Sequence, residues 1–172
     1  MEGCWAIDVT KRFWIFLPAG LAVVGVLLFI LLSTTTGAHL RLEGKILKVR
    51  VLPVNSGLAS IVVVDFRATN PSDVPFVVSS VKLLLEPASG DAMEGTQASK
   101  PDLQDIFQYA KVIGPKYNDV LSLQDRVAPH QTVDRMTGAR FEVPEAAINS
   151  RKGIRLQIED VDGAMAELSE SK

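Results

Sequence analysis

The stretch IVVVDFRATNPSDVPFVVSSVKLLLE, residues 61–86, contains two runs of alternating side chains separated by a short polar break. In the first run, the even-numbered residues from Val62 to Ala68 share the face that we expect to meet the core. In the second run, the odd-numbered residues from Val77 to Leu85 share a face. A period of two residues is typical of β-strands, and the Asn-Pro-Ser-Asp break predicts that the two runs form an antiparallel pair.

A further strand is predicted on the N-terminal side of this stretch. The segment KILKVRVL, residues 45–52, alternates in the same way. We expect Leu47, Val49 and Val51 to share the core face. Arg50 falls on the opposite face, and the residues PVNSG that follow have the composition of a turn.

The segment after the two central strands has a different composition. Residues 87–101 are rich in Gly, Pro and small polar residues, so we predict a mobile surface loop. Apolar residues then recur at helical spacing and predict a helix over residues 102–112, packed on the edge of the sheet. Gly114 and Pro115 end this pattern. The expected buried face of the helix consists of Leu103, Ile106, Phe107 and Ala110, with Val112 as a further candidate.

The C-terminal third returns to short alternating runs. Residues 132–143 and 154–158 read as strands, separated by a single helical turn over residues 144–148. Asp162-Gly163 is a hairpin signal before a last short strand, residues 164–168. Many short strands with turn signals and little helix predict a mainly-β fold, an antiparallel β-sandwich with one short inserted helix.

The N-terminal part contains a run of 20 residues without a charge, FWIFLPAGLAVVGVLLFILL, residues 13–32. As a helix it would be roughly 30 Å long, which matches the hydrocarbon core of a bilayer. It exceeds the usual core of a cleaved signal peptide, so we predict a retained signal-anchor, a single transmembrane helix in contact with the lipid bilayer. The predicted organisation is a tail (1–12), the membrane helix (13–32), a linker (33–42) and a β-sandwich domain (43–172).

The charges beside this run predict its orientation. Lys11 and Arg12 adjoin the run directly, whereas Arg41 lies eight uncharged residues beyond its other end. The positive-inside rule then favours a cytoplasmic N-terminus and an extracytoplasmic domain on the inner (plasma) membrane. Cys4, the single cysteine, precedes the run and is interpreted as an ordinary thiol, with reversible acylation as the alternative.

Composition and motifs argue against several functional classes. The chain has 18 Lys and Arg against 20 Asp and Glu, so it lacks the net positive charge typical of a nucleic-acid groove, and we predict no nucleic-acid partner. Its two histidines, His39 and His130, are far apart in sequence, and no G-x-S-x-G motif is present. We therefore predict a protein that is not an enzyme and has no catalytic residue, metal or cofactor.

The acidic segment Glu159–Gly163 invites comparison with a calcium-binding loop. A helix–loop–helix calcium site needs acids where this chain has Ile158 and Ser169. We interpret the segment as a hairpin turn, with a weak divalent-cation site shared with another loop as the alternative.

Two sets of residues are candidates for binding. Phe107 and Tyr109 of the predicted helix, together with Tyr117, are a possible aromatic contact patch for a partner protein, with core packing as the alternative for Phe107. Asn70 and Asp73, in the polar break, are a possible loop contact. The alternative for the Asn-Pro pair is a backbone role, because Asn accepts turn geometry and Pro restricts φ.

Two segments resemble known families. Residues 64–86, with Asn70-Pro71 between two apolar strands, resemble the water-stress/hypersensitive-response domain (WHy), the folded branch of the late-embryogenesis-abundant proteins, although Ser72 replaces the usual second Asn. Residues 127–148, with the pattern G-x-x-F-x-V-P, are similar to the end of bacterial immunoglobulin-like domains on membrane anchors. These resemblances imply an immunoglobulin-like or fibronectin-III-like sandwich in a bacterial cell envelope, and they carry over no catalytic residues.

The expected function follows from the predicted anchor and sandwich. We expect a membrane-anchored, non-enzymatic module, an interaction or scaffold domain that binds an envelope protein through residues 88–118. The alternative, from the stress-protein resemblance, is a structural protein that protects membranes or proteins without a specific partner.

Overall fold

The computed structural model describes residues 21–30 and 42–170 of the chain. Residues 21–30 form a helix with exposed side chains. They belong to the apolar run predicted to span a membrane, and the rest of that run lies outside the described residues, as do the predicted tail and nearly all of the linker. None of the helices within the described ranges has the length and hydropathy needed to cross a membrane.

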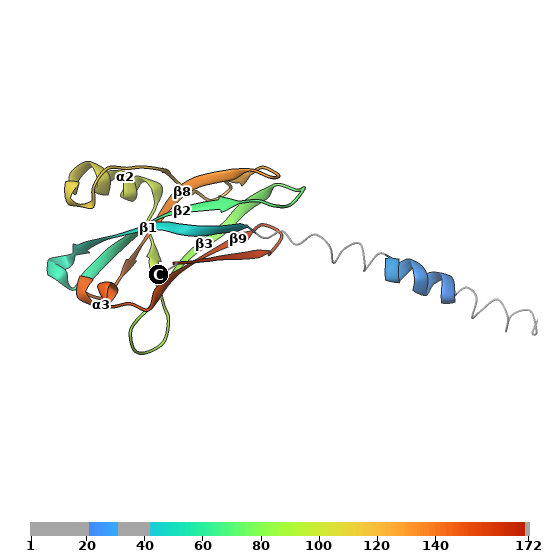
Figure 1. The fold of residues 1–172 in the computed structure, drawn as a ribbon, viewed down its shortest axis with the longest axis horizontal. Coiled ribbons are helices and arrows are strands. Elements are labelled where there is room, and N and C mark those ends of the chain that lie inside the picture. Colours follow the sequence, from blue (N-terminus) through green and yellow to red (C-terminus); the bar gives the residue numbers. More distant parts are fainter. Residues whose placement is uncertain (1–20, 31–41, 171–172) are drawn as a thin grey trace, which may run out of the picture. The chain divides into compact units, whose positions relative to one another are not determined.

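Residues 42–170 fold into two β-sheets that form two layers (Figure 1). The strands are β1 (Glu43–Val54), β2 (Ala59–Thr69), β3 (Phe76–Glu86), β4 (Met93–Glu94), β5 (Thr96–Gln97), β6 (Asp119–Val120), β7 (Arg126–Val127), β8 (Thr132–Phe141), β9 (Gly153–Asp160) and β10 (Met165–Ser169). The helices are η1 (Asn55–Gly57), α2 (Lys100–Tyr109), η2 (Lys111–Ile113) and α3 (Glu145–Asn149). The mainly-β architecture predicted from the alternating runs is confirmed.

The strand order defines the two layers. The first sheet has the order β1-β2-β8-β5, with β6 also paired to β8, and the second has the order β10-β9-β3-β4, with β7 also paired to β3. The pairings are antiparallel, except that β6 runs parallel to β8.

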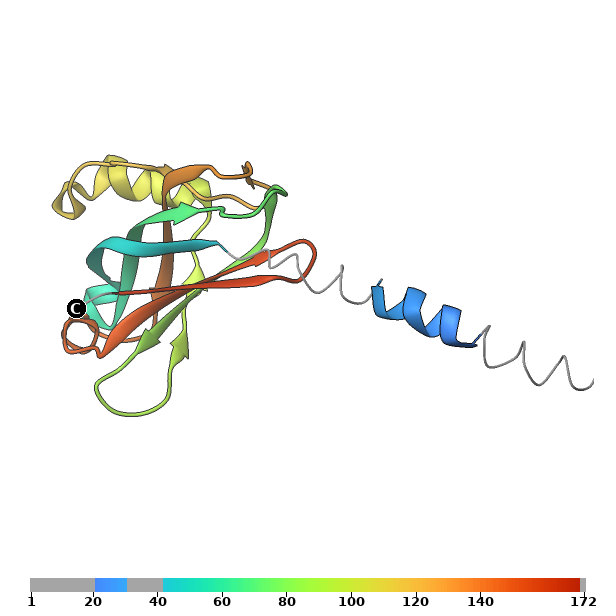
Figure 2. The same cartoon turned by 45° about the vertical axis from the view of Figure 1, so that its right-hand side comes forward.

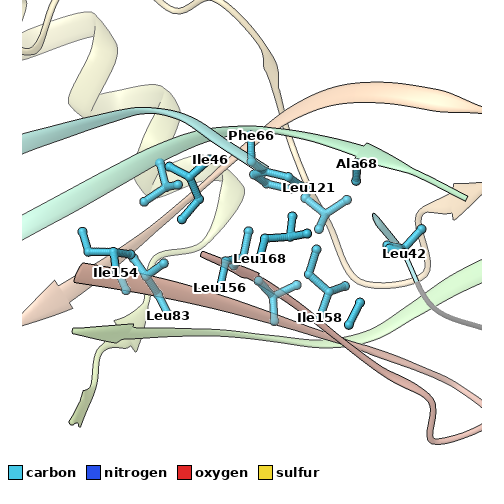
Figure 3. Close-up of a cluster of buried hydrophobic side chains, with 14 of the residues drawn as sticks. Leu42, Ile46, Phe66, Ala68, Leu83, Leu121, Ile154, Leu156, Ile158 and Leu168 are labelled. Carbon is cyan, nitrogen blue, oxygen red and sulfur yellow. The ribbon is translucent and has the colours of Figure 1, made fainter. Parts of the chain in front are cut away.

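The main hydrophobic core lies between the two sheets. Figure 3 shows Ile46 and Phe66 of the first sheet together with Leu83, Leu156 and Ile158 of the second. The even-numbered residues of β2 from Val62 to Ala68 belong to this core, as predicted, because β2 has an uninterrupted register with β8. Burial of these apolar side chains is the main source of stability for such a sandwich.

A β-bulge in β1 changes the predicted core face of that strand. The register with β2 shifts between Ile46 and Lys48, so Leu47 is the extra residue. Ile46 is buried and Leu47 is 44% exposed, which corrects the prediction that Leu47 faces the core. Val49 and Val51 pack against the core as predicted. The extra residue reverses the predicted alternation only for the residues before the bulge, and these two residues follow it.

A second bulge has the same effect in β3. The register with β9 shifts between Val78 and Ser80, which makes Ser79 the extra residue. The predicted face is correct from Val81 onward. It is wrong before the bulge, where Val78 is buried in place of Val77, and Ser79 itself is exposed.

The polar break at residues 70–75 connects the two sheets. β2 pairs with β1 and β8, whereas β3 pairs with β9, β4 and β7. The predicted antiparallel pairing of β2 with β3 is therefore wrong. Side-chain alternation shows that both segments are strands, but it holds no information about which strand lies beside them.

The predicted loop over residues 87–101 is only partly a loop. Residues 88–92 are exposed, and Figure 2 shows the connection between β3 and β4 extending from the domain. After it, β4 pairs with β3 and β5 pairs with β8, so the chain crosses from the second sheet to the first. Gly95 lies at the crossing, where an added Cβ would be 2.7 Å from the Phe141 ring. The close approach of the backbone explains the glycine.

The inserted helix covers a sheet face. Figure 1 shows α2 over the sheet that contains β1, β2 and β8. Its apolar residues join a second core with Leu52, Val63 and Met136, on the outer side of the first sheet. The prediction that the helix packs on the sheet edge is therefore corrected, while the helical turn before β9 and the hairpin between β9 and β10 are confirmed.

Candidate partner-binding surface

The α2 arm, which we define as residues 99–118, begins with a well-formed helix N-terminus. The Ser99 hydroxyl accepts a hydrogen bond from the Asp102 backbone N–H at 3.3 Å, and the Ser99 backbone N–H donates to the Asp102 carboxylate at 3.1 Å. These reciprocal bonds form a capping box, which satisfies donors that lack partners within the helix. Hydrogen bonds from the Ser99 hydroxyl and backbone lower the pKa of Asp102.

The arm lies close to the sheet because Leu103 packs against Gly138 of β8, which has no side chain. Leu103 is fully buried, and a Cβ added to Gly138 of β8 would lie 2.7 Å from Leu103 Cδ2. Ile106, Phe107 and Ala110 pack beside Leu103 on the second core. The predicted apolar face of the helix is confirmed for these four residues, but not for Val112, which is exposed.

A buried ion pair lies beneath the arm. Arg50 Nη2 donates to Asp65 Oδ2 at 2.6 Å, and the two side chains are 6% and 4% exposed. Asp65 Oδ1 also accepts a hydrogen bond from Asn118 Nδ2 at 2.9 Å. The sheet and the end of the arm are thus joined by one charged group, the Asp65 carboxylate.

Arg50 makes further contacts with the arm. Its Nη1 donates to the Pro115 carbonyl at 2.9 Å and to the Ile113 carbonyl at 3.4 Å. The guanidinium lies 4.8 Å from the Phe107 ring centroid and 5.5 Å from that of Tyr117. Hydrogen bonds and cation–π contacts together hold the arm on the sheet at this position.

The structure therefore brings together two of the three predicted aromatic residues. Phe107 is partly buried over Arg50, so it supports the arm more than it contacts solvent. Tyr117 lies beside Arg50 and is 59% exposed, with Lys48 Nζ 5.0 Å from its ring centroid. Tyr109, at the end of α2, is 77% exposed.

A further exposed apolar residue lies on the same arm. Val112, in η2, is 83% exposed, although the sequence analysis placed it at the end of the predicted helix. The chain leaves α2 at Tyr109, and η2 then buries Ile113 in place of Val112. The arm thus presents Tyr109, Val112 and Tyr117 to solvent on a support that is fixed by buried contacts.

The second predicted site, in the loop after β2, is mostly structural. Asn70 is fully buried, and its Nδ2 donates to the carbonyls of Val74 at 2.8 Å and Val127 at 3.1 Å. Its Oδ1 accepts from the Ser72 backbone N–H and hydroxyl. The Asn70 amide thus bonds within the domain, which supports the alternative of a backbone role, and its contact with a ligand stays a prediction.

Asp73 is the exposed member of the predicted pair. Its carboxylate lies 2.9 Å from His130 Nε2, and the two side chains are 95% and 65% exposed. This contact joins the loop after β2 to the turn before β8 at the surface. An exposed ion pair of this kind contributes little to stability.

The described residues hold no group of three or more His, Cys, Asp or Glu side chains placed to bind a metal ion.

Asp160 has a structural role in the acidic hairpin. It is buried, and its carboxylate accepts hydrogen bonds from the Val77 backbone N–H at 2.5 Å and the Asp162 backbone N–H at 3.3 Å. His39 lies outside the described residues.

Arg50 and Asp65 are the structural residues that sequence reasoning missed. Both were assigned to the face opposite the core, which normally means solvent. A signal was present in the sequence: Asp65 interrupts a long apolar run, and a strand that is apolar on both faces is covered on both sides.

No protein-family model matches the chain, and a search of curated proteins finds no match. The resemblances to the water-stress domain and to bacterial immunoglobulin-like domains therefore stay predictions from the sequence. The functional proposal draws on the geometry of the described residues and on the sequence.

Proposed function

We propose that this protein is a membrane-anchored, non-enzymatic interaction module of a bacterial cell envelope. Its apolar run at residues 13–32 would hold an immunoglobulin-like or fibronectin-III-like sandwich on the extracytoplasmic side of the plasma membrane. The α2 arm would bind an envelope protein.

The observation that carries this proposal is the exposure of Tyr109, Val112 and Tyr117 on a rigid support. Tyrosine is enriched at protein interfaces because it offers a large apolar surface and a hydroxyl at low cost in conformational entropy. The capping box and the buried Arg50–Asp65 pair fix the arm before a partner binds. A preorganised surface loses less entropy on association than a flexible one.

Site-specific photocrosslinking in cells tests the proposal. Benzoylphenylalanine at position 109 or 112 should give a discrete adduct with one protein. The matched control is position 58, because Leu58 is 70% exposed and lies outside the α2 arm. Tyr109→Ala with Tyr117→Ala should reduce the adduct formed from position 112.

The outcomes separate the two functional hypotheses. Equal adducts from positions 58, 109 and 112 would contradict a specific surface on the arm. Absence of a discrete adduct, together with protection of unrelated enzymes during drying, would favour the alternative of a stress-protective protein without a specific partner.

Protease protection of a C-terminal tag in spheroplasts tests the orientation. Digestion without lysis is expected if the domain is extracytoplasmic. Protection of the tag until the cells are lysed would contradict the proposed orientation and would direct the search for a partner to soluble proteins.

A further inference from the structure

The outer edge of β3 has an interruption where a strand is missing. β7 pairs with Phe76 and Val77 at one end of this edge, and β4 pairs with Leu84 and Leu85 at the other. Between them, the segment that connects β6 to β7 forms backbone hydrogen bonds with Val78, and the Gly95 N–H donates to the Leu83 carbonyl. Among the described residues, no strand pairs with this edge over residues 79–82.

Some backbone N–H and C=O groups at this interruption point away from β9, toward the outer edge of β3. The Leu83 carbonyl accepts from the Gly95 N–H at 2.9 Å on the outer edge, and groups two residues apart along a strand point to the same edge. The N–H and C=O of Val81 therefore face the interruption. Unpaired groups at a sheet edge are a template for another extended chain.

A hollow of about 540 Å³ lies at the same place. It lies between the two segments that cross from one sheet to the other, and its lining includes Ser79, Lys82, Glu94, Thr96 and Leu123. We call the hollow and the unpaired edge of residues 79–82 the β3 slot. The slot extends over roughly 16 Å between Val78 and Leu83, at about 3.3 Å per residue.

We propose that the β3 slot binds a short, uncharged, extended peptide segment of another protein by strand addition. The flanking strands β7 and β4 occupy the same line as the missing strand, so the edge of a second folded sheet cannot enter. A single extended segment of three to four residues fits between them. Its backbone bonds to Val81, while its side chains meet the hollow.

The lining of the slot argues for a segment without net charge. Lys82 and Glu94 lie 3.6 Å apart at the slot, so its one cation and one anion already compensate each other. The remaining lining is small and polar apart from Val81 and Leu123. Main-chain hydrogen bonds would therefore supply most of the recognition. This proposal is independent of the aromatic arm surface and of the membrane anchor.

Selection of displayed eight-residue peptides on the full chain in detergent micelles tests the proposal. Selected peptides are expected to bind wild type at least about tenfold more tightly than Leu123→Trp, which fills the hollow. Leu58→Trp is the matched control, since Leu58 is 70% exposed, against 59% for Leu123, but does not line the slot, and it should bind like wild type. Hydrogen exchange at the Val81 amide should slow when a selected peptide binds.

A second variant removes a backbone donor, although it also replaces a core side chain. Val81→Pro removes the N–H that faces the slot and should also weaken peptide binding at least about tenfold. If Val81→Pro does not fold, the Leu123→Trp comparison decides the result. The proposal is overturned if no peptide distinguishes wild type from Leu123→Trp, or if bound peptides protect amides elsewhere and leave Val81 unprotected.

Discussion

Arg50 is a cation held almost entirely out of water on the outer side of a sheet. Desolvation of a guanidinium and a carboxylate is costly, and here it is offset by the bond to Asp65, two backbone carbonyls and two aromatic rings. A buried pair of this type is weak evidence for net stability, because the cost of desolvation can equal the attraction. We infer that its role in this protein is to fix the α2 arm in one position.

Removal of one partner of this pair should be strongly destabilising. Arg50→Met leaves Asp65 buried without its cation, and we expect a loss of about 3–5 kcal/mol in the free energy of unfolding. Arg50→Met with Asp65→Leu should recover most of that loss. Urea unfolding measures both variants, and Arg67→Met is the control, since its pair with Asp134 is exposed and should contribute little to stability.

A loss below about 1 kcal/mol for Arg50→Met would show that the buried pair does not hold the arm. The double-mutant cycle is required because the stability lost by the single variant includes the cost of an unpaired buried charge as well as the loss of the contact.

Asn70 should be as important to stability as a core residue. Asn70→Ala leaves the carbonyls of Val74 and Val127 without the amide donor, and we expect a loss of at least about 2 kcal/mol. Asp73→Ala, three residues along the same loop, should change stability by no more than about 0.5 kcal/mol because its side chain is 95% exposed. Thermal unfolding compares the two, and equal losses would contradict the structural role of Asn70.

At the scale of elements, the connection from β3 to β5 has two parts with different roles. Residues 88–92 are exposed, whereas Met93 packs against the core and Gly95 contacts Phe141. Loop shortening costs little free energy when the ends stay in place, and loss of a paired strand costs much more.

Deletion of residues 88–92 should leave a domain that unfolds cooperatively, because the deleted residues are exposed. Deletion of residues 93–97 should abolish cooperative unfolding, because it removes β4 and β5 from both sheets. Circular dichroism during urea unfolding checks both variants. Cooperative unfolding of the 93–97 deletion would show that the crossing is dispensable.

The capping box of α2 should make stability depend on pH. Bonds from Ser99 lower the pKa of Asp102, so the stabilisation is present above the ordinary aspartate value of 3.8 and is lost as pH falls through the lower folded-state pKa. Asp102→Asn should therefore be less stable than wild type at about pH 7, and the difference should be smaller at about pH 3, below the ordinary aspartate value. Thermal unfolding at the two pH values measures this, with Asp105→Asn, elsewhere on the helix, as the control; a difference that is independent of pH would contradict the charge-dependent cap.

At the scale of the whole molecule, the first sheet is buried on both faces. The core between the sheets contains Phe66, and the second core beneath α2 contains Leu103. Because both cores share β2 and β8, we expect them to unfold together.

Phe66→Ala should cost about 3–5 kcal/mol and Leu103→Ala about 2–5 kcal/mol, because both side chains are almost fully buried. Both variants should shift one common unfolding transition, as followed by urea unfolding with two spectroscopic probes. Leu58→Ala is the exposed control. A loss below about 1 kcal/mol for Phe66→Ala would show that the face assignment of β2 is wrong, and separate transitions for Leu103→Ala would show that the arm unfolds by itself.

The candidate site could be predicted only in part. Helical spacing correctly assigned Phe107 to the supporting face of α2 and left Tyr109 exposed. The sequence grouped Phe107 with Tyr117, but it did not show what holds them together, because Arg50, from a strand more than fifty residues earlier, lies against both rings. Asn70 was recognised as a turn residue, but its burial depends on Val127, which is distant in sequence.

The sequence by itself determined the six longer strands of this protein, which faces of β2, β8 and β9 are apolar, and where α2 and the last hairpin form, but not the short strands β4 to β7. These features depend on alternation, capping and turn chemistry, which act between near neighbours in the chain. Only the tertiary structure decided the bulges at Leu47 and Ser79, the placement of β2 and β3 in different sheets, and the burial of Arg50 with Asp65. Those features depend on contacts between residues far apart in sequence, and local periodicity contains no information about which strand or segment will lie alongside.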